Sequence, residues 1–68
     1  MSTSSDLALL SSLGSQLEEL GARITEMAER YGATPDSALA SELFAAERAL
    51  FGARRALDRA RGYLEDMI

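Results

Sequence analysis

The chain lacks cysteine, histidine and tryptophan, and these absences exclude several kinds of protein. Without cysteine there is no disulfide framework or thiolate metal site, and without histidine the commonest transition-metal ligand and general base is missing. A chain of 68 residues buries a small core, so domains of this size are usually stabilised by disulfides, a metal or association. Association with another chain is the option that this composition leaves.

The chain also has little positive charge and no long apolar run. Its net charge is −4, and all seven basic residues are arginines. Proteins that track phosphates need a basic surface, so we expect no binding to nucleic acid or to anionic membranes. No apolar run approaches the roughly 20 residues that span a bilayer, and the first residues do not resemble a signal peptide. We therefore expect a cytoplasmic protein.

Valine is absent, whereas alanine and leucine dominate the apolar residues, which is typical of helices. The only proline, Pro35, follows Gly32 and Thr34, a combination that suits a helix end, an N-cap and the first position of a second helix. Ser4 or Ser5 can cap the first helix. A short connection forces two helices to run antiparallel. The expected units are one domain over residues 1–68, a first helix over about 5–31, a turn at 32–34 and a second helix over about 35–66.

Both predicted helices carry apolar residues at heptad spacing, with positions labelled a to g. In the first helix, position a holds Leu10, Leu17, Ile24 and Tyr31, and position d holds Leu13, Leu20 and Met27. In the second helix, position a holds Leu43, Leu50, Leu57 and Leu64, and position d holds Ala46, Ala53 and Ala60. The pattern predicts an all-α antiparallel two-helix hairpin, packed as a heptad-patterned coiled coil.

The two apolar stripes also predict a register. If paired residue numbers add to about 70, every a position of one helix faces a d position of the other. In that register Arg30 falls opposite Glu42, and Leu9 falls opposite Tyr63. Leucine facing alanine allows a close approach, so we expect a tight hairpin.

Several small or aromatic residues lie outside the predicted seam and indicate a second contact. Phe44 and Phe51 are seven residues apart at position b. The first helix has a strip of small residues at position e, and the second has another strip on its outer side; these are Gly14, Gly21 and Ala28, and Ala45, Ala49 and Gly52. We expect two hairpins to dimerise into a four-helix bundle with the phenylalanine rings in its core. The alternative is a groove for a helix of another protein, with the two rings as anchors.

The sequence contains no recognisable catalytic, metal or cofactor site. It has no histidine base and no thiol, and the Glu-x-x-His pairs of carboxylate-bridged metal sites in helical bundles are missing. A glycine-rich phosphate loop needs a preceding strand, and no strand is predicted. We therefore expect a protein that is not an enzyme and needs no cofactor.

The second helix has an arginine-rich stretch, formed by Arg48, Arg54, Arg55, Arg59 and Arg61. Such a stretch is either a solvated, ion-paired face or a contact for an anionic ligand or an acidic partner. The sequence thus predicts a non-enzymatic interaction or adaptor module built on a homo-oligomeric helical hairpin. Two alternatives stay open: a small regulatory protein, anti-sigma-like or ligand-sensing, that uses the arginine face, and a structural subunit of a larger helical complex.

Overall fold

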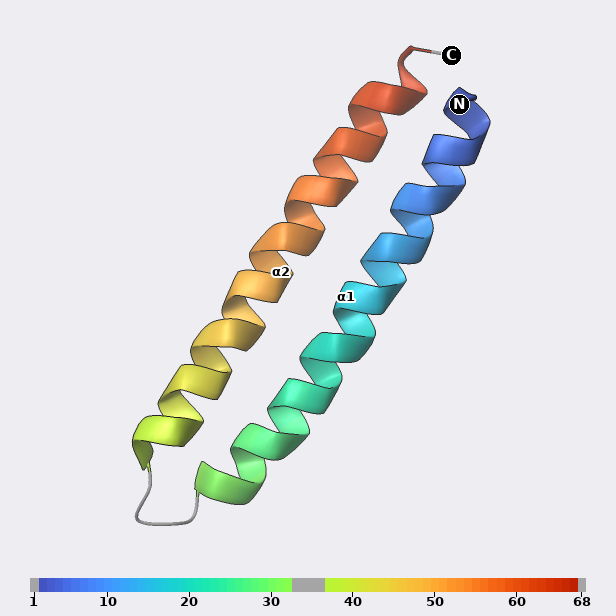
Figure 1. Cartoon of the computed structure of the whole chain (residues 1–68). Coiled ribbons are helices and arrows are strands. Elements are labelled where there is room, and N and C mark those ends of the chain that lie inside the picture. The colour runs from blue at the N-terminus through green and yellow to red at the C-terminus, as the bar shows by residue number, and fades with distance from the viewer. Residues whose placement is uncertain (1, 33–36, 68) are drawn as a thin grey trace.

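The protein is a hairpin of two long helices, seen in a computed structural model that describes residues 2–32 and 37–67. Helix α1 spans Thr3–Gly32 and helix α2 spans Ser37–Glu65. The helices lie side by side and antiparallel, so that both chain ends lie at one end of the molecule (Figure 1). The expected all-helical hairpin is confirmed, and the described residues contain no strand.

The N-terminal cap differs from the one expected. The Oγ atom of Ser2 accepts a hydrogen bond from the backbone N–H of Ser5 at 3.1 Å, and the Ser2 carbonyl accepts one from the N–H of Asp6 at 3.1 Å. Ser2 is therefore the N-cap, because its side chain satisfies a backbone donor that the first turn leaves free. Ser4 and Ser5, the expected caps, lie within the first turn of α1.

The first residue of the expected turn, Gly32, differs from the expectation. Gly32 is the last residue of α1, and no described glycine has a positive φ. The left-handed conformation expected of a glycine just beyond a helix is therefore not adopted at Gly32. The expected capping residues Thr34 and Pro35 lie outside the described residues, and α2 begins at Ser37.

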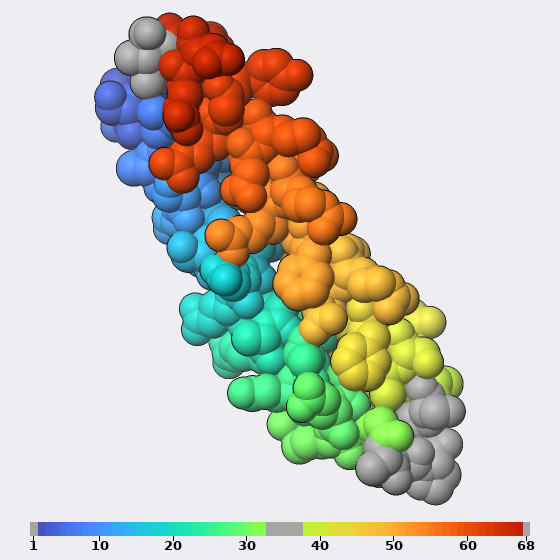
Figure 2. All heavy atoms as spheres, turned by 180° about the vertical axis from the view of Figure 1, so that it is seen from behind, coloured from blue at the N-terminus to red at the C-terminus, as the bar shows by residue number. Residues whose placement is uncertain are grey.

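The hairpin is elongated and has almost no interior. Its principal extents are 52, 14 and 13 Å, and the helices touch along their length (Figure 2). Among the described residues the buried apolar side chains are Ala28, 0% exposed, and Ala40, 5% exposed, and no large side chain is fully buried. Two helices share one seam and leave their remaining apolar sides in contact with solvent. Within the described ranges, no helix is long and apolar enough to cross a membrane.

Candidate interaction surface

The small residues at position e of α1 lie inside the hairpin. Gly14, Gly21 and Ala28 are all buried. A Cβ atom added to Gly21 would lie 3.9 Å from Cε1 of Phe51, and one added to Gly14 would lie 3.8 Å from Nε of Arg54. The close approach expected at this strip is therefore made by α2 of the same chain. These residues do not lie on the outer surface, where the sequence placed them to meet another chain.

Because position e of α1 faces α2, the residues at position d are turned away from α2. Position d is partly exposed, with Leu13 at 37%, Leu20 at 46% and Met27 at 38%, whereas Leu17 and Ile24 at position a are half-buried. The expected seam of a and d residues is therefore corrected to a seam of a and e residues. The physical reason is size, because glycine and alanine leave room for side chains of α2 such as Phe51 and Arg54.

Helix α2 also contacts its partner helix through positions a and e. Ala40, at position e, is buried, and the leucines at position a are half-buried. Glu47 and Arg54, also at position e, are half-buried, so their aliphatic stems flank the seam. The alanines expected to fill the seam lie further out, with Ala53 and Ala60 exposed. Both helices are thus rotated in the same sense relative to the expected packing.

The observed contacts agree with the expected register. Three pairs bring residues of the two helices together: Gly21 with Phe51, Gly14 with Arg54, and Glu18 with Arg54. Their residue numbers add to between 68 and 72, around the expected value of about 70. The sequence therefore predicted which levels of the helices meet, although it misplaced the side chains that fill the contact.

The two phenylalanines and an interhelical ion pair lie together on one side of the hairpin. The guanidinium of Arg54 pairs with the carboxylate of Glu18 at 2.5 Å, and the ring of Phe51 lies against Gly21. Phe44, seven residues earlier in α2, is half-buried, and Phe51 is 46% exposed. These contacts place position b of both helices along one side, which we call the Phe side.

The opposite side of the hairpin is largely apolar, although Gln16, Arg23, Arg30 and Glu42 also lie there at position g. In two antiparallel helices joined by the same heptad positions, equivalent positions lie on the same side, so positions d and g face away from the Phe side. We call this surface the Leu–Ala face; its exposed apolar members are Leu9, Leu13, Leu20, Met27, Ala49, Ala53, Ala56, Ala60 and Tyr63. Sequence reasoning missed its leucines because it assigned them to the seam. The glycines at position e were the signal that could have corrected this.

The outer strip expected on α2 is only partly accessible. Ala49 is exposed, whereas Ala45 and Gly52 are half-buried. A Cβ atom added to Gly52 would meet nothing within 4 Å, so the surroundings of this glycine are open. Of this strip, Ala49 belongs to the Leu–Ala face.

The five arginines of α2 divide into two groups. Arg54 pairs with Glu18 across the hairpin, and Arg61 pairs with Glu65 at 3.1 Å on its own helix. The remaining three, Arg48, Arg55 and Arg59, are exposed and form no ion pair within residues 2–32 and 37–67. An anionic ligand or acidic partner would therefore meet three guanidinium groups that are not already engaged.

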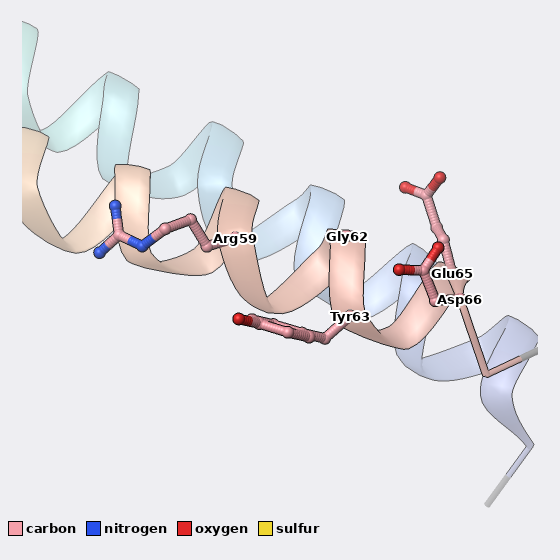
Figure 3. Close-up of a pocket in the computed structure, with 5 residues that line it drawn as sticks. All are labelled: Arg59, Gly62, Tyr63, Glu65 and Asp66. Atoms are coloured by element: carbon pink, nitrogen blue, oxygen red, sulfur yellow. The ribbon is translucent and has the colours of Figure 1, made fainter.

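One shallow hollow lies on the last turns of α2, lined by Arg59, Gly62, Tyr63, Glu65 and Asp66 (Figure 3). The ring of Tyr63 runs along the helix toward Arg59, and the two acidic side chains project near the helix end. All five lining residues are exposed, and four of them lie in α2 while Asp66 directly follows it, so the hollow does not enclose a ligand. No group of acidic residues that could hold a metal ion occurs in the part of the chain that the structure describes.

Comparison of the chain with models of known protein families, with curated proteins and with solved structures found no match. The interpretation of this surface therefore depends on the residues and their geometry.

Proposed function

We propose that the chain is a non-enzymatic protein-interaction module that works as a homodimer, two hairpins forming a four-helix bundle. The observation that carries the proposal is the Leu–Ala face, a long, largely apolar surface on a hairpin whose described residues include no fully buried large side chain. A surface of this kind on a small protein marks an interaction site. Two helices alone leave it open to water, and a second hairpin is the smallest structure that covers it.

The accessible surface of the hairpin supports the same proposal. It measures 4913 Å², whereas a compact monomeric protein of 7.3 kDa exposes about 4,200 Å². The excess is roughly 700 Å², close to the roughly 800 Å² that each partner buries in a standard protein interface. One interface of ordinary size would therefore bring the chain to the surface area of a compact protein.

Light scattering coupled to gel filtration, together with sedimentation equilibrium, tests self-association. The expected result is a discrete dimer at micromolar concentration that remains helical and whose melting temperature rises with protein concentration. A monomer at all concentrations from micromolar to millimolar would refute the proposal. A broad, poorly helical aggregate would instead favour an obligate subunit of a larger complex.

A second candidate function rests on the three exposed arginines that form no ion pair, Arg48, Arg55 and Arg59. Guanidinium groups bind phosphates and carboxylates in a bidentate manner, which suits a regulator that senses an anionic ligand or holds an acidic partner. Thermal melting in the presence of cyclic dinucleotides and of an acidic peptide tests this candidate. Stabilisation that disappears in an Arg48→Gln, Arg55→Gln double variant would support it, whereas no stabilisation by either ligand would refute it.

A further inference from the structure

The direction of the leucine stripe indicates how many helices surround α1. The stripe of a and d residues is centred between Leu17 and Leu20, whereas the contact with α2 is centred between Leu17 and Gly21. At 100° per residue these two directions differ by about 50°. A stripe made for one partner helix would point directly at it.

A four-helix bundle accounts for this angle. When four helices stand at the corners of a square, the centre lies about 45° from the line that joins a helix to either neighbour. A leucine stripe turned by about 50° from α2 therefore points at such a centre. The second neighbour of each helix then lies on the side of positions d and g, which is the Leu–Ala face.

Two symmetric arrangements would let the Leu–Ala faces of two copies meet. With a two-fold axis perpendicular to the helices, α1 lies against α1 of the partner, and leucines meet leucines while alanines meet alanines. With the axis parallel to the helices, α1 lies against α2 of the partner, so the leucine side of one copy faces the alanine side of the other. In the second arrangement each pair of helices across the interface combines a leucine side with an alanine side. The two interhelical distances are therefore similar, which a square bundle requires.

The parallel axis also fixes which residues meet. Rotation about an axis along the helices does not shift one copy lengthwise, so the register within the hairpin is kept between the copies. Leu13 then falls opposite the partner's Ala56, and Leu20 falls opposite the partner's Ala49. The residue numbers of each pair add to 69, within the range of the contacts observed inside the hairpin. Large side chains thus face small ones across the interface.

The residues at the two ends of the face fit the same arrangement. Arg30 and Glu42 are exposed at position g and form no ion pair with each other inside the described chain. Across the parallel axis their residue numbers add to 72, so the guanidinium of one copy lies level with the carboxylate of the other. Leu9 and Tyr63 meet in the same way at the opposite end. The face therefore complements itself in shape along its leucine–alanine pairs and in charge at the level of Arg30 and Glu42.

We propose that a second copy of this chain covers the Leu–Ala face about a two-fold axis parallel to the helices, with α1 packed against α2 of the partner. This inference rests on the self-association proposed above. It assigns Leu20 and Ala49 to the centre of the interface and leaves the Phe side on the outer surface of the dimer.

Disulfide crosslinking tests the arrangement, because the natural chain contains no cysteine. Tagged Leu20→Cys chains are refolded together with untagged Ala49→Cys chains and then oxidised mildly. The mixed dimer should crosslink about ten-fold or more faster than two Leu20→Cys chains do, because a disulfide requires Cα atoms within about 7 Å. The two copies of Leu20 lie on diagonally opposite helices and are further apart than that.

The outcomes separate this inference from the proposed function. A fast Leu20→Cys homodimer crosslink with no mixed crosslink would overturn the parallel axis while leaving self-association intact. A natural chain that is monomeric at every concentration would overturn both, and would mean that something other than a second copy covers the face.

A matched pair of charge substitutions tests the face without any crosslink. Ala53→Glu places a carboxylate on the Leu–Ala face, and Ala22→Glu places one on exposed helix surface outside it. Burying an unpaired charge is costly, so Ala53→Glu should raise the dimer dissociation constant about 100-fold or more while Ala22→Glu changes it little. Circular dichroism checks that both variants stay helical. Equal effects of the two substitutions would overturn the assignment of this face.

Discussion

Replacing Gly21 by alanine should stabilise the hairpin, although Gly21 is buried beneath a ring. The added Cβ atom would lie 3.9 Å from Cε1 of Phe51, which is an ordinary van der Waals contact. Glycine inside a helix costs about 1 kcal/mol relative to alanine. The substitution removes this cost and adds a methyl contact to the ring, so the free energy of unfolding should rise by about 1 to 1.5 kcal/mol.

Gly52 provides the matched control. It lies inside α2, and a Cβ atom added there would meet nothing within 4 Å. Gly52→Ala should therefore gain about 1 kcal/mol from helix propensity alone. Urea denaturation and thermal melting followed by circular dichroism, at one fixed protein concentration, measure both variants. A gain of this size corresponds to roughly 4–8 °C in melting temperature for a domain this small.

A larger side chain at the same site should reverse the sign. In Gly21→Leu the atoms beyond Cβ need the space that the Phe51 ring occupies, and overpacking of this kind costs about 1–3 kcal/mol. The reasoning is refuted if Gly21→Ala destabilises the protein as much as Gly21→Leu does. That result would mean that the helices approach more closely than the 3.9 Å contact allows.

Three further experiments probe other contacts. Ser2→Ala removes the hydroxyl that accepts the N–H of Ser5 and should cost about 0.5–1 kcal/mol in urea denaturation, and an unchanged stability would show that the cap contributes nothing. A double-mutant cycle on Glu18 and Arg54 should give a coupling of at most about 1 kcal/mol that shrinks as salt is added, since both side chains are substantially exposed; a larger coupling that is insensitive to salt would contradict this. Phe51→Ala should lower stability by about 1.5–2.5 kcal/mol, about half of the cost at a fully buried site, yet leave the mass by light scattering unchanged. Loss of the dimer in Phe51→Ala would place the ring in the interface after all.

Local sequence signals predicted the helices well. The heptad leucines and the single proline at position 35 indicated two helices with one turn, and the structure contains α1 and α2 with bounds close to those expected. The register was also predictable, because an apolar stripe can be matched level by level with another. These features depend on the spacing of residues along one helix, which the sequence displays directly.

The rotation of the helices about their own axes was harder to predict. A heptad stripe shows the mean direction of burial, which is the same for a two-stranded coiled coil and for one helix of a four-helix bundle. Leu13 and Leu20 were therefore placed in the seam, and Gly14 and Gly21 were placed outside it. The structure reverses these positions because small residues permit a closer approach of α2. The small residues at position e, beside the leucine stripe, indicated this rotation. The sequence alone does not show whether position d or position e faces the other helix.

The hairpin has two dissimilar ends, one where α1 begins and α2 ends, and the other where α1 ends and α2 begins (Figure 1). A two-fold axis along the helices would keep this polarity in the dimer and gather all four chain ends at one end of the bundle. A perpendicular axis would instead separate the two pairs by the length of the molecule, 52 Å. Dimerisation about the parallel axis would therefore place any segments attached to the chain ends side by side. The symmetry of a dimer that covers the Leu–Ala face would thus also decide whether segments attached to the two copies lie close together or far apart.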